Sequence, residues 1–281
     1  MAIDYAVTLE CEPKKHFGSG DCAKGALNIL DRLKSKNRAA ALRQLTDGKG
    51  VNEAVVTIRL MIHDREGNPI QREVTLAELE AEAKLLDGHA SACNGCRANF
   101  LGQAYGCFGA INYPIPESGE AWLLGRVQPA GSLGAQLCAE FMAEFGLKGD
   151  PVRRMRDEGL FDARKTGKAT LSKKFLRSVS VSADQLLETI FMAGNPLAPG
   201  HCFGILIWLG AIRVDGRVPS SPDDQAVIRT LLGLQSPQDK EQHTQLELGP
   251  KMTAKGPAEF QLLATALYLC WVCDVPLYIS P

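Results

Sequence analysis

The residues of this chain best suited to chemistry are three cysteines and a histidine in one short stretch: His89, Cys93, Cys96 and Cys107. Two residues separate the first two cysteines, and thiolates at this spacing chelate one ion from a single tight turn. Gly95 lies between them and frees the backbone to make that turn. Because Zn²⁺ favours a closed tetrahedral site of four nitrogen and sulfur ligands, the sequence predicts a structural zinc site formed by these four residues.

Two alternatives to zinc remain open at this stretch. A [4Fe–4S] cluster would also take Cys93, Cys96 and Cys107, with a fourth ligand from elsewhere in the chain or with an open iron. The same residues would otherwise be reduced thiols, although three cysteines in a polar loop are hard to explain as packing. His89 follows a predicted helix end, and three other cysteines compete with it as fourth ligand: Cys22, Cys138 and Cys202. We favour zinc with His89.

The remaining cysteines and histidines have a simpler interpretation. Cys270 and Cys273 share the two-residue spacing, but they lie near the C-terminal end of an apolar helical run. A redox pair is typically found at a helix N-terminus, where the dipole lowers the thiol pKa. We therefore expect this pair to pack in the core. The same is expected of Cys202, which lies at the start of another apolar segment. His16 and His63 are expected to be ordinary loop and strand residues.

The segment 151–180 is the most basic part of the chain. It contains nine Lys or Arg residues and three acidic residues, whereas the whole chain has 31 basic and 32 acidic residues and a net charge of −1. Such a segment is suited to bind nucleic-acid phosphates or an acidic protein partner, although a solvated loop explains it equally well. The residues predicted to make these contacts are Arg153, Arg154, Arg156, Lys165, Lys168, Lys173, Lys174 and Arg177.

Alternation of apolar and polar residues predicts two half-buried strands in the N-terminal part, at 3–10 and 53–63. Turn-forming residues at 64–68 join the second strand to a return strand at 70–74, which predicts a hairpin. A fourth strand is expected at 107–115, directly after the metal stretch.

Helix signals complete this part of the chain. Thr75 and Glu78 form a capping box, which predicts a helix through Leu86 with Gly88 as its stop. A long helix is expected from Asp21 to Leu45, with a polar loop at 11–21 before it. The order strand, helix, strand, strand, helix, strand is typical of a ferredoxin-like βαββαβ sheet.

The rest of the chain is predicted to be mainly helical. Helices are expected at 119–127, 132–146, 182–192 and 258–274, with another that starts at 219–224. The stretch 236–257 is expected to be an exposed loop. The fold class is therefore predicted as α+β, with a ferredoxin-like α+β domain at 1–116 that carries the metal loop and a mainly helical region at 117–281 packed against it.

The composition indicates a globular protein of the cytoplasm. The chain has 281 residues, of which 45% are hydrophobic and 22% charged, enough for a sizeable core. It shows no signal-peptide pattern and no run apolar and long enough to favour a membrane partner, and an odd count of nine cysteines argues against a disulfide framework. No phosphate-binding glycine loop or nucleophile elbow is present. We therefore expect an intracellular zinc protein that binds a protein or nucleic acid, with an iron–sulfur enzyme or electron-transfer protein as the alternative.

Overall fold

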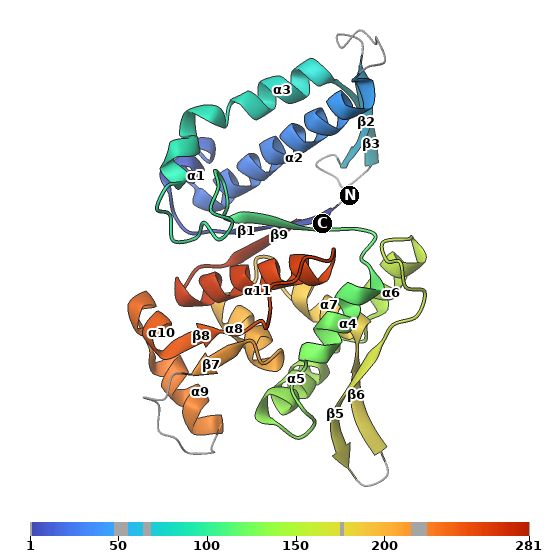
Figure 1. Cartoon of the computed structure of the whole chain (residues 1–281), viewed down its shortest axis with the longest axis vertical. Helices are drawn as coiled ribbons and strands as arrows, with labels where there is room; N and C mark the ends of the chain where they lie inside the picture. The colour runs from blue at the N-terminus through green and yellow to red at the C-terminus, as the bar shows by residue number, and fades with distance from the viewer. Residues whose placement is uncertain (1, 48–55, 64–68, 175–176, 215–223, 281) are drawn as a thin grey trace. The chain divides into compact units, whose positions relative to one another are not determined.

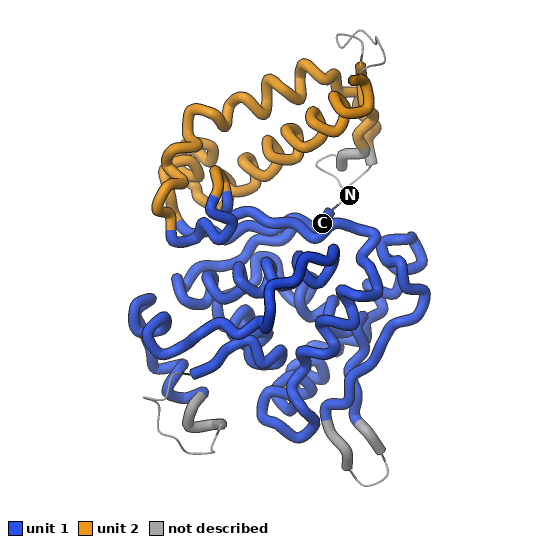
Figure 2. Tube along the Cα trace, in the orientation of Figure 1, with its two compact units in different colours: residues 1–9, 97–102, 106–281 blue, residues 10–96, 103–105 orange. Residues whose placement is uncertain are grey.

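The computed structural model describes residues 2–47, 56–63, 69–174, 177–214 and 224–280, with the backbone alone for 61–63, 69, 172–174, 177–178 and 224–227. The chain forms two compact units (Figure 2). Unit 1 comprises residues 1–9, 97–102 and 106–281, and unit 2 comprises residues 10–96 and 103–105. Helices and strands are mixed, in agreement with the α+β prediction. The domain boundary predicted after residue 116 falls inside unit 1.

Unit 2 packs helices against a β-hairpin (Figure 1). Its elements are α1 (Glu12–Phe17), α2 (Cys22–Thr46), β2 (Thr57–His63), β3 (Pro69–Thr75), α3 (Leu76–Lys84) and the 3₁₀ helix η2 (Asp87–Cys93). Strands β2 and β3 are antiparallel, with Thr57 opposite Thr75, so the predicted hairpin is confirmed. Ala39 of α2, Val74 of β3 and Leu79 of α3 lie in one buried cluster. The apolar face of the hairpin therefore covers the two helices.

The helix signals read from the sequence in unit 2 act as expected at their starts. The Asp21 carboxylate accepts hydrogen bonds from the backbone N–H groups of Ala23 and Lys24, and it begins α2. Both hydrogen bonds of the capping box between Thr75 and Glu78 are present at the start of α3. Helix α3 ends at Lys84, two residues before the predicted Leu86, and Gly88 does not stop it, because Gly88 lies inside η2. The predicted turn at 64–68 lies outside the described residues.

Unit 1 is built on a sheet made from the two ends of the chain. The strand order is β4–β1–β9, from β4 (Phe108–Asn112), β1 (Ala2–Val7) and β9 (Leu277–Ser280). Strand β1 is antiparallel to both neighbours, and its Tyr5 lies opposite Gly109 and Ile279. A Cβ atom on Gly109 would lie 2.4 Å from the Tyr5 ring, so the buried tyrosine requires glycine there. Helix α11 (Pro257–Val272) packs against all three strands.

This sheet corrects the ferredoxin-like prediction. The order of elements along the chain was read as one four-stranded sheet, whereas β2 and β3 form a separate two-stranded sheet. The central strand β1 takes β9 as its second neighbour instead, and β9 lies at the far end of the sequence. The order of elements at 1–116 could not predict this pairing, because β9 lies outside the predicted N-terminal domain and takes the place beside β1 that a strand of the hairpin was expected to fill.

The remaining elements of unit 1 are mostly helices. They are α4 (Glu117–Arg126), α5 (Leu133–Glu144), α6 (Asp150–Asp157), α7 (Ala183–Phe191), α8 (Pro199–Trp208), α9 (Asp224–Gly233) and α10 (Pro237–His243). Two small antiparallel sheets accompany them, the hairpin β5 (Lys168–Lys174)–β6 (Arg177–Ser182) and the pair β7 (Ile212–Val214) and β8 (Thr244–Leu246), between which α9 and α10 lie in sequence. The loop predicted at 236–257 is wrong where α10 and β8 form. Within the described residues, no helix combines the length and apolar character needed to cross a membrane.

A buried ion network joins three of these helices. Arg156 of α6 lies between Glu120 of α4 and Asp184 of α7, and all three residues are buried. All five N–H groups of the guanidinium donate: two to the Glu120 carboxylate, two to Asp184 and one to the Ala163 carbonyl. Burial raises the pKa of Glu120, and the hydrogen bonds from Arg156 oppose that shift. Arg156 is thus the cation that offsets the cost of burying two carboxylates.

Replacement of Arg156 by Met should lower the free energy of unfolding by about 3–5 kcal/mol, because two carboxylates would stay buried without their cation. The measurement is urea unfolding at pH 7. Arg154→Met on the same helix is the matched control, since Arg154 is exposed, and it should change the free energy by less than about 0.5 kcal/mol. Equal stabilities of the two variants would contradict a central role for the network.

Candidate metal centre

Helix α1 presents two metal-ligating residues one turn apart. Glu12 and His16 are four residues apart in the helix, so their side chains share a face. Cys11 precedes the helix in an extended conformation, with φ −155° and ψ 163°, and Pro13 lies in the first turn, where its fixed φ favours a helix start. The sequence interpretation placed these residues in a polar loop, and that prediction is wrong.

Close packing on α2 fixes the position of α1. A Cβ atom on Gly25 of α2 would lie 1.8 Å from the Lys14 carbonyl oxygen, so only glycine permits this approach. The Asn28 side-chain amide donates to the Phe17 carbonyl over 2.7 Å. The Arg32 guanidinium lies 4.8 Å from the centre of the Phe17 ring. Because a helix of six residues is not stable alone, these contacts are what hold Glu12 and His16 in place.

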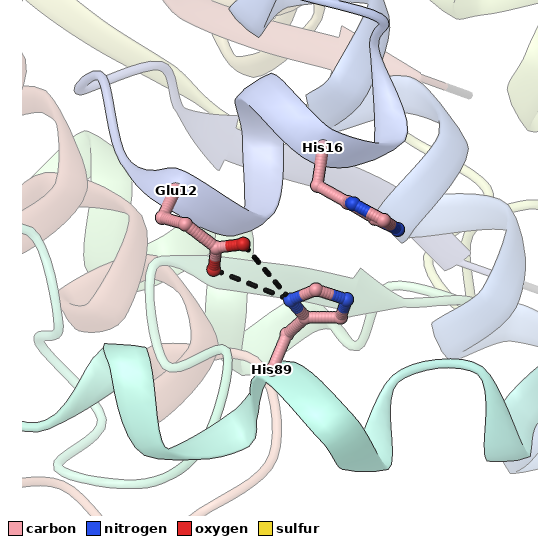
Figure 3. A group of neighbouring side chains, drawn as sticks. All are labelled: Glu12, His16 and His89. Carbon is pink, nitrogen blue, oxygen red and sulfur yellow. Dashed lines mark hydrogen bonds and ion pairs between the residues drawn. The ribbon is translucent and has the colours of Figure 1, made fainter.

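His89 of η2 meets the two donors of α1. Its Nδ1 atom lies 3.2 Å from the carboxylate of Glu12, and its ring centre lies 4.2 Å from that of His16 (Figure 3). One ligand atom from each of these three residues lies within 4.8 Å of the other two. In the part of the chain that the structure describes, this is the one group of three His, Cys, Asp or Glu donors so close together. Two imidazoles and a carboxylate are a ligand set that zinc accepts.

The backbone at Cys93 and Cys96 forms the tight turn that the sequence predicted. The Cys96 N–H donates to the Cys93 carbonyl over 3.3 Å, and Gly95 has a φ of +73°, in the left-handed region that favours glycine. The Tyr105 N–H donates to the Cys93 sulfur over 3.2 Å. Cys93 is buried and Cys96 is half-buried.

Cys11 shares an electrostatic environment with this turn. Burial raises the pKa of the Cys11 thiol, while a hydrogen bond from the backbone N–H of Lys14 lowers it. The charges of Cys96 and Cys93 also raise this pKa. Among the described residues of unit 2 there are thus two sets of donors. The oxygen–nitrogen set, Glu12, His16 and His89, converges to within 4.8 Å, and the sulfur set, Cys11, Cys93 and Cys96, does not.

The four ligands predicted from the sequence divide between these groups. His89, Cys93 and Cys96 belong to unit 2, and the close donors of His89 are Glu12 and His16. Cys107 belongs to unit 1, where its side chain is buried and its carbonyl accepts a hydrogen bond from the Val7 N–H. The predicted zinc set stays a prediction, and the group that the structure brings together shares only His89 with it.

Sequence reasoning missed Cys11, Glu12 and His16. A signal was available, because Glu and His four residues apart share a face of any helix that contains them. It does not indicate a helix by itself, because the stretch between the first strand and Gly18 has no apolar periodicity long enough to predict one. The residues on which α1 rests lie in α2, later in the chain.

The other cysteines are mostly core residues, as expected for Cys202 and Cys270. Cys138, Cys202 and Cys270 are fully buried in unit 1, and burial raises the pKa of the Cys138 thiol to about 12. Cys273 differs from the expectation, since it is half-buried. Cys22 opens α2, is half-buried, and remains a competing ligand inside unit 2.

The basic segment folds as α6 followed by the β5–β6 hairpin. Four of its predicted contact residues are exposed: Arg153, Arg154, Lys165 and Lys168. Arg153 also forms an ion pair of 2.8 Å with Asp150. The prediction is wrong for Arg156, whose guanidinium is buried and fully hydrogen bonded, so it has no donor left for a phosphate. The side chains of Lys173, Lys174 and Arg177 lie outside the description.

Comparison with known proteins assigns no family to this geometry. No protein-family model matches the chain, and no curated protein or solved structure matches it. The function must therefore be argued from the donor groups and surfaces of the chain itself.

Replacement of Gly25 by Ala tests whether the approach of α1 to α2 positions the donors. The new Cβ would collide with the Lys14 carbonyl, so the variant should lose about 1–3 kcal/mol in urea unfolding despite the better helix propensity of Ala. Gly125→Ala in α4 is the control, because a Cβ atom there meets open space, and it should be neutral or stabilising by up to about 1 kcal/mol. If Gly25→Ala is as stable as the wild type, the packing argument fails.

Proposed function

We propose that unit 2 binds one zinc ion through Glu12, His16 and His89. The observation that supports this most is the convergence of their ligand atoms to within 4.8 Å of one another. Zinc bonds of about 2.0–2.1 Å place tetrahedral ligands about 3.4 Å apart, so the group needs to close by about an ångström. Glu12 and His16 are exposed, and their side chains have room to rotate by that much.

The ion would serve to join α1 to η2. These elements lie far apart in sequence, and the Glu12–His89 contact spans 77 residues. Zinc bonds would replace an exposed imidazole–carboxylate pair, which by itself contributes about 0–1 kcal/mol. The Cys11 thiolate, next to Glu12, is our proposed fourth ligand, and it would close the site as structural zinc requires.

The sulfur set supports a second candidate, the iron–sulfur protein. Cys11, Cys93 and Cys96 lie within electrostatic range in one unit, and three thiolates are the minimum that holds a [4Fe–4S] cluster with one open iron. In this case the protein would be an enzyme or an electron carrier. The sequence-based set replaces Cys11 by Cys107, so both cysteines need to be tested.

We further propose that the zinc-loaded protein is a binding module for nucleic acid. The support is the excess of six positive charges in 151–180 and the exposure of Arg153, Arg154, Lys165 and Lys168. These cations lie on α6, in the loop after it and at the start of β5, where they can pair with backbone phosphates, Arg153 in exchange for its ion pair with Asp150. Such contacts depend on salt and little on base sequence.

The zinc proposal predicts one zinc per chain and a colourless protein. Metal content is measured by mass spectrometry after purification without a metal-affinity step, and affinity by competition with a chelator. His16→Ala and Glu12→Gln should each weaken zinc binding at least tenfold, because each removes a ligand. His243→Ala is the control, since His243 lies in unit 1 and should leave the affinity unchanged.

Cobalt substitution separates the two donor sets. Co²⁺ bound through Cys11 gives thiolate charge-transfer absorption, which Cys11→Ser should abolish and Cys93→Ser and Cys107→Ser should leave intact. Absorption that is lost in Cys93→Ser but not in His16→Ala would move the metal to the sulfur set. A brown, iron-containing anaerobic preparation would replace zinc by the cluster, and a metal-free protein with no measurable zinc affinity would end the proposal.

The nucleic-acid proposal predicts that neutralising four exposed cations weakens binding. Changing Arg153, Arg154, Lys165 and Lys168 to Gln should lower affinity for a duplex oligonucleotide and reduce the salt slope by about 0.9 for each lost phosphate contact. The control carries three neutralised cations of α2: Lys34, Lys36 and Arg38. Equal affinities for the two variants would leave the segment as solvated surface.

A further inference from the structure

Unit 1 contains an apolar cavity of about 260 Å³. Strands β1 and β9 line it with Ile3 and Ile279, and helices α6 and α7 line it with Val152, Met155 and Leu187. Among the described residues around it, none is charged and only Tyr113 and Asn195 are polar. Water is not stabilised in such an apolar cavity, because a buried water molecule needs about two to four polar partners for its hydrogen bonds.

We propose that this cavity binds a neutral apolar molecule of about ten carbon atoms, either a fused aromatic ring system or a short alkyl chain. The size follows from its volume, since an apolar cavity of about 150 Å³ accommodates benzene. Leaving 260 Å³ empty would cost packing free energy, and an apolar ligand would recover it.

The charges around the cavity select against an anionic ligand. Phe161 forms part of the wall, and the Arg156 guanidinium lies 4.4 Å from the centre of its ring. That cation has no free donor, because its five N–H groups are taken by Glu120, Asp184 and the Ala163 carbonyl. The ion network as a whole carries one negative charge, so a carboxylate in the cavity would find repulsion instead of a partner.

The polar lining leaves room for at most one uncharged polar group on the ligand. The Asn195 side chain already bonds the backbone of Ile279 in both directions, donating over 2.7 Å and accepting over 3.2 Å. Tyr113 is the other polar residue of the lining, and burial followed by the charge of Asp4 raises the pKa of its hydroxyl, so the hydroxyl stays protonated and able to donate. A hydroxyl or carbonyl oxygen is what such a donor would pair with.

The rim of the cavity allows entry. Met192 is 43% exposed, and Asn195 beside it is exposed as well. Met155 on the opposite helix is half-buried. Unbranched methionine side chains change rotamer easily and adapt to ligands of different shape. The entrance is therefore adaptable, whereas the interior is formed by buried aliphatic residues on helices and strands.

The test uses three ligands that share one ring system: naphthalene, 1-naphthol and 1-naphthoate. Each is titrated into the full chain by calorimetry. The neutral pair should bind saturably with one site and a negative heat-capacity change, and 1-naphthoate should bind at least tenfold more weakly than 1-naphthol. Absence of saturable binding by both neutral ligands, or equal affinity for the anion, would overturn the proposal.

A substitution that fills the cavity tests whether the ligand binds there. Val152→Phe places a ring in the space and should weaken naphthalene binding at least tenfold without loss of native circular dichroism. Val179→Phe makes the same change at an exposed position of β6, and its affinity should stay within twofold of wild type. If Val152→Phe does not fold, Met155→Trp at the half-buried rim takes its place. A folded filling variant with wild-type affinity would refute the assignment.

Discussion

The guanidinium of Arg156 is the constraint on which unit 1 depends. Three helices supply charged groups to one buried point, and those groups are tolerable there only together, because an unpaired buried carboxylate costs several kcal/mol. The planar fork of arginine fits this task, since it bonds Glu120 and Asp184 along two edges at once. The network thus specifies one relative arrangement of α4, α6 and α7 out of the many that apolar packing alone would allow.

Helix α6 connects the ion network to the cavity, because it carries Arg156 as well as the lining residues Val152 and Met155. It has eight residues, and its N-cap residue is Gly149, which has a φ of +80° and donates its N–H to the buried Glu188 carboxylate. Arg156 anchors its last turn, while Val152 and Met155 line the apolar space. A helix held at its start by one carboxylate and at its end by two more has little freedom to collapse inward. Because these hydrogen bonds and ion pairs hold α6 in place, the helix does not move inward to fill the apolar cavity, and the cavity persists in an otherwise packed unit.

The parts of the fold that sequence predicted are those whose signals are local. The β2–β3 hairpin and the capped starts of α2, α3, α5 and α7 depend on residues within a few positions of one another. The sheet of unit 1 does not, because the Thr8 hydroxyl bonds the Pro276 carbonyl across 268 residues. No local pattern in β1 indicates which strand will lie beside it. Short elements such as α1 and α10 escaped for a related reason, since tertiary contacts stabilise them and their own periodicity is too brief to detect.

The same distinction runs through the candidate metal centre. The Cys93–Cys96 turn was predictable because a thiol pair and its glycine lie together in sequence, whereas the meeting of His16 with His89 depends on the close approach of α1 to α2 at Gly25. The two donor sets also favour different chemistry. Sulfur ligands suit zinc and iron–sulfur clusters, while imidazole and carboxylate suit zinc and other divalent ions and, as three ligands, leave a position open to water. Whether Cys11 fills that position decides between a closed structural ion and one able to activate a substrate.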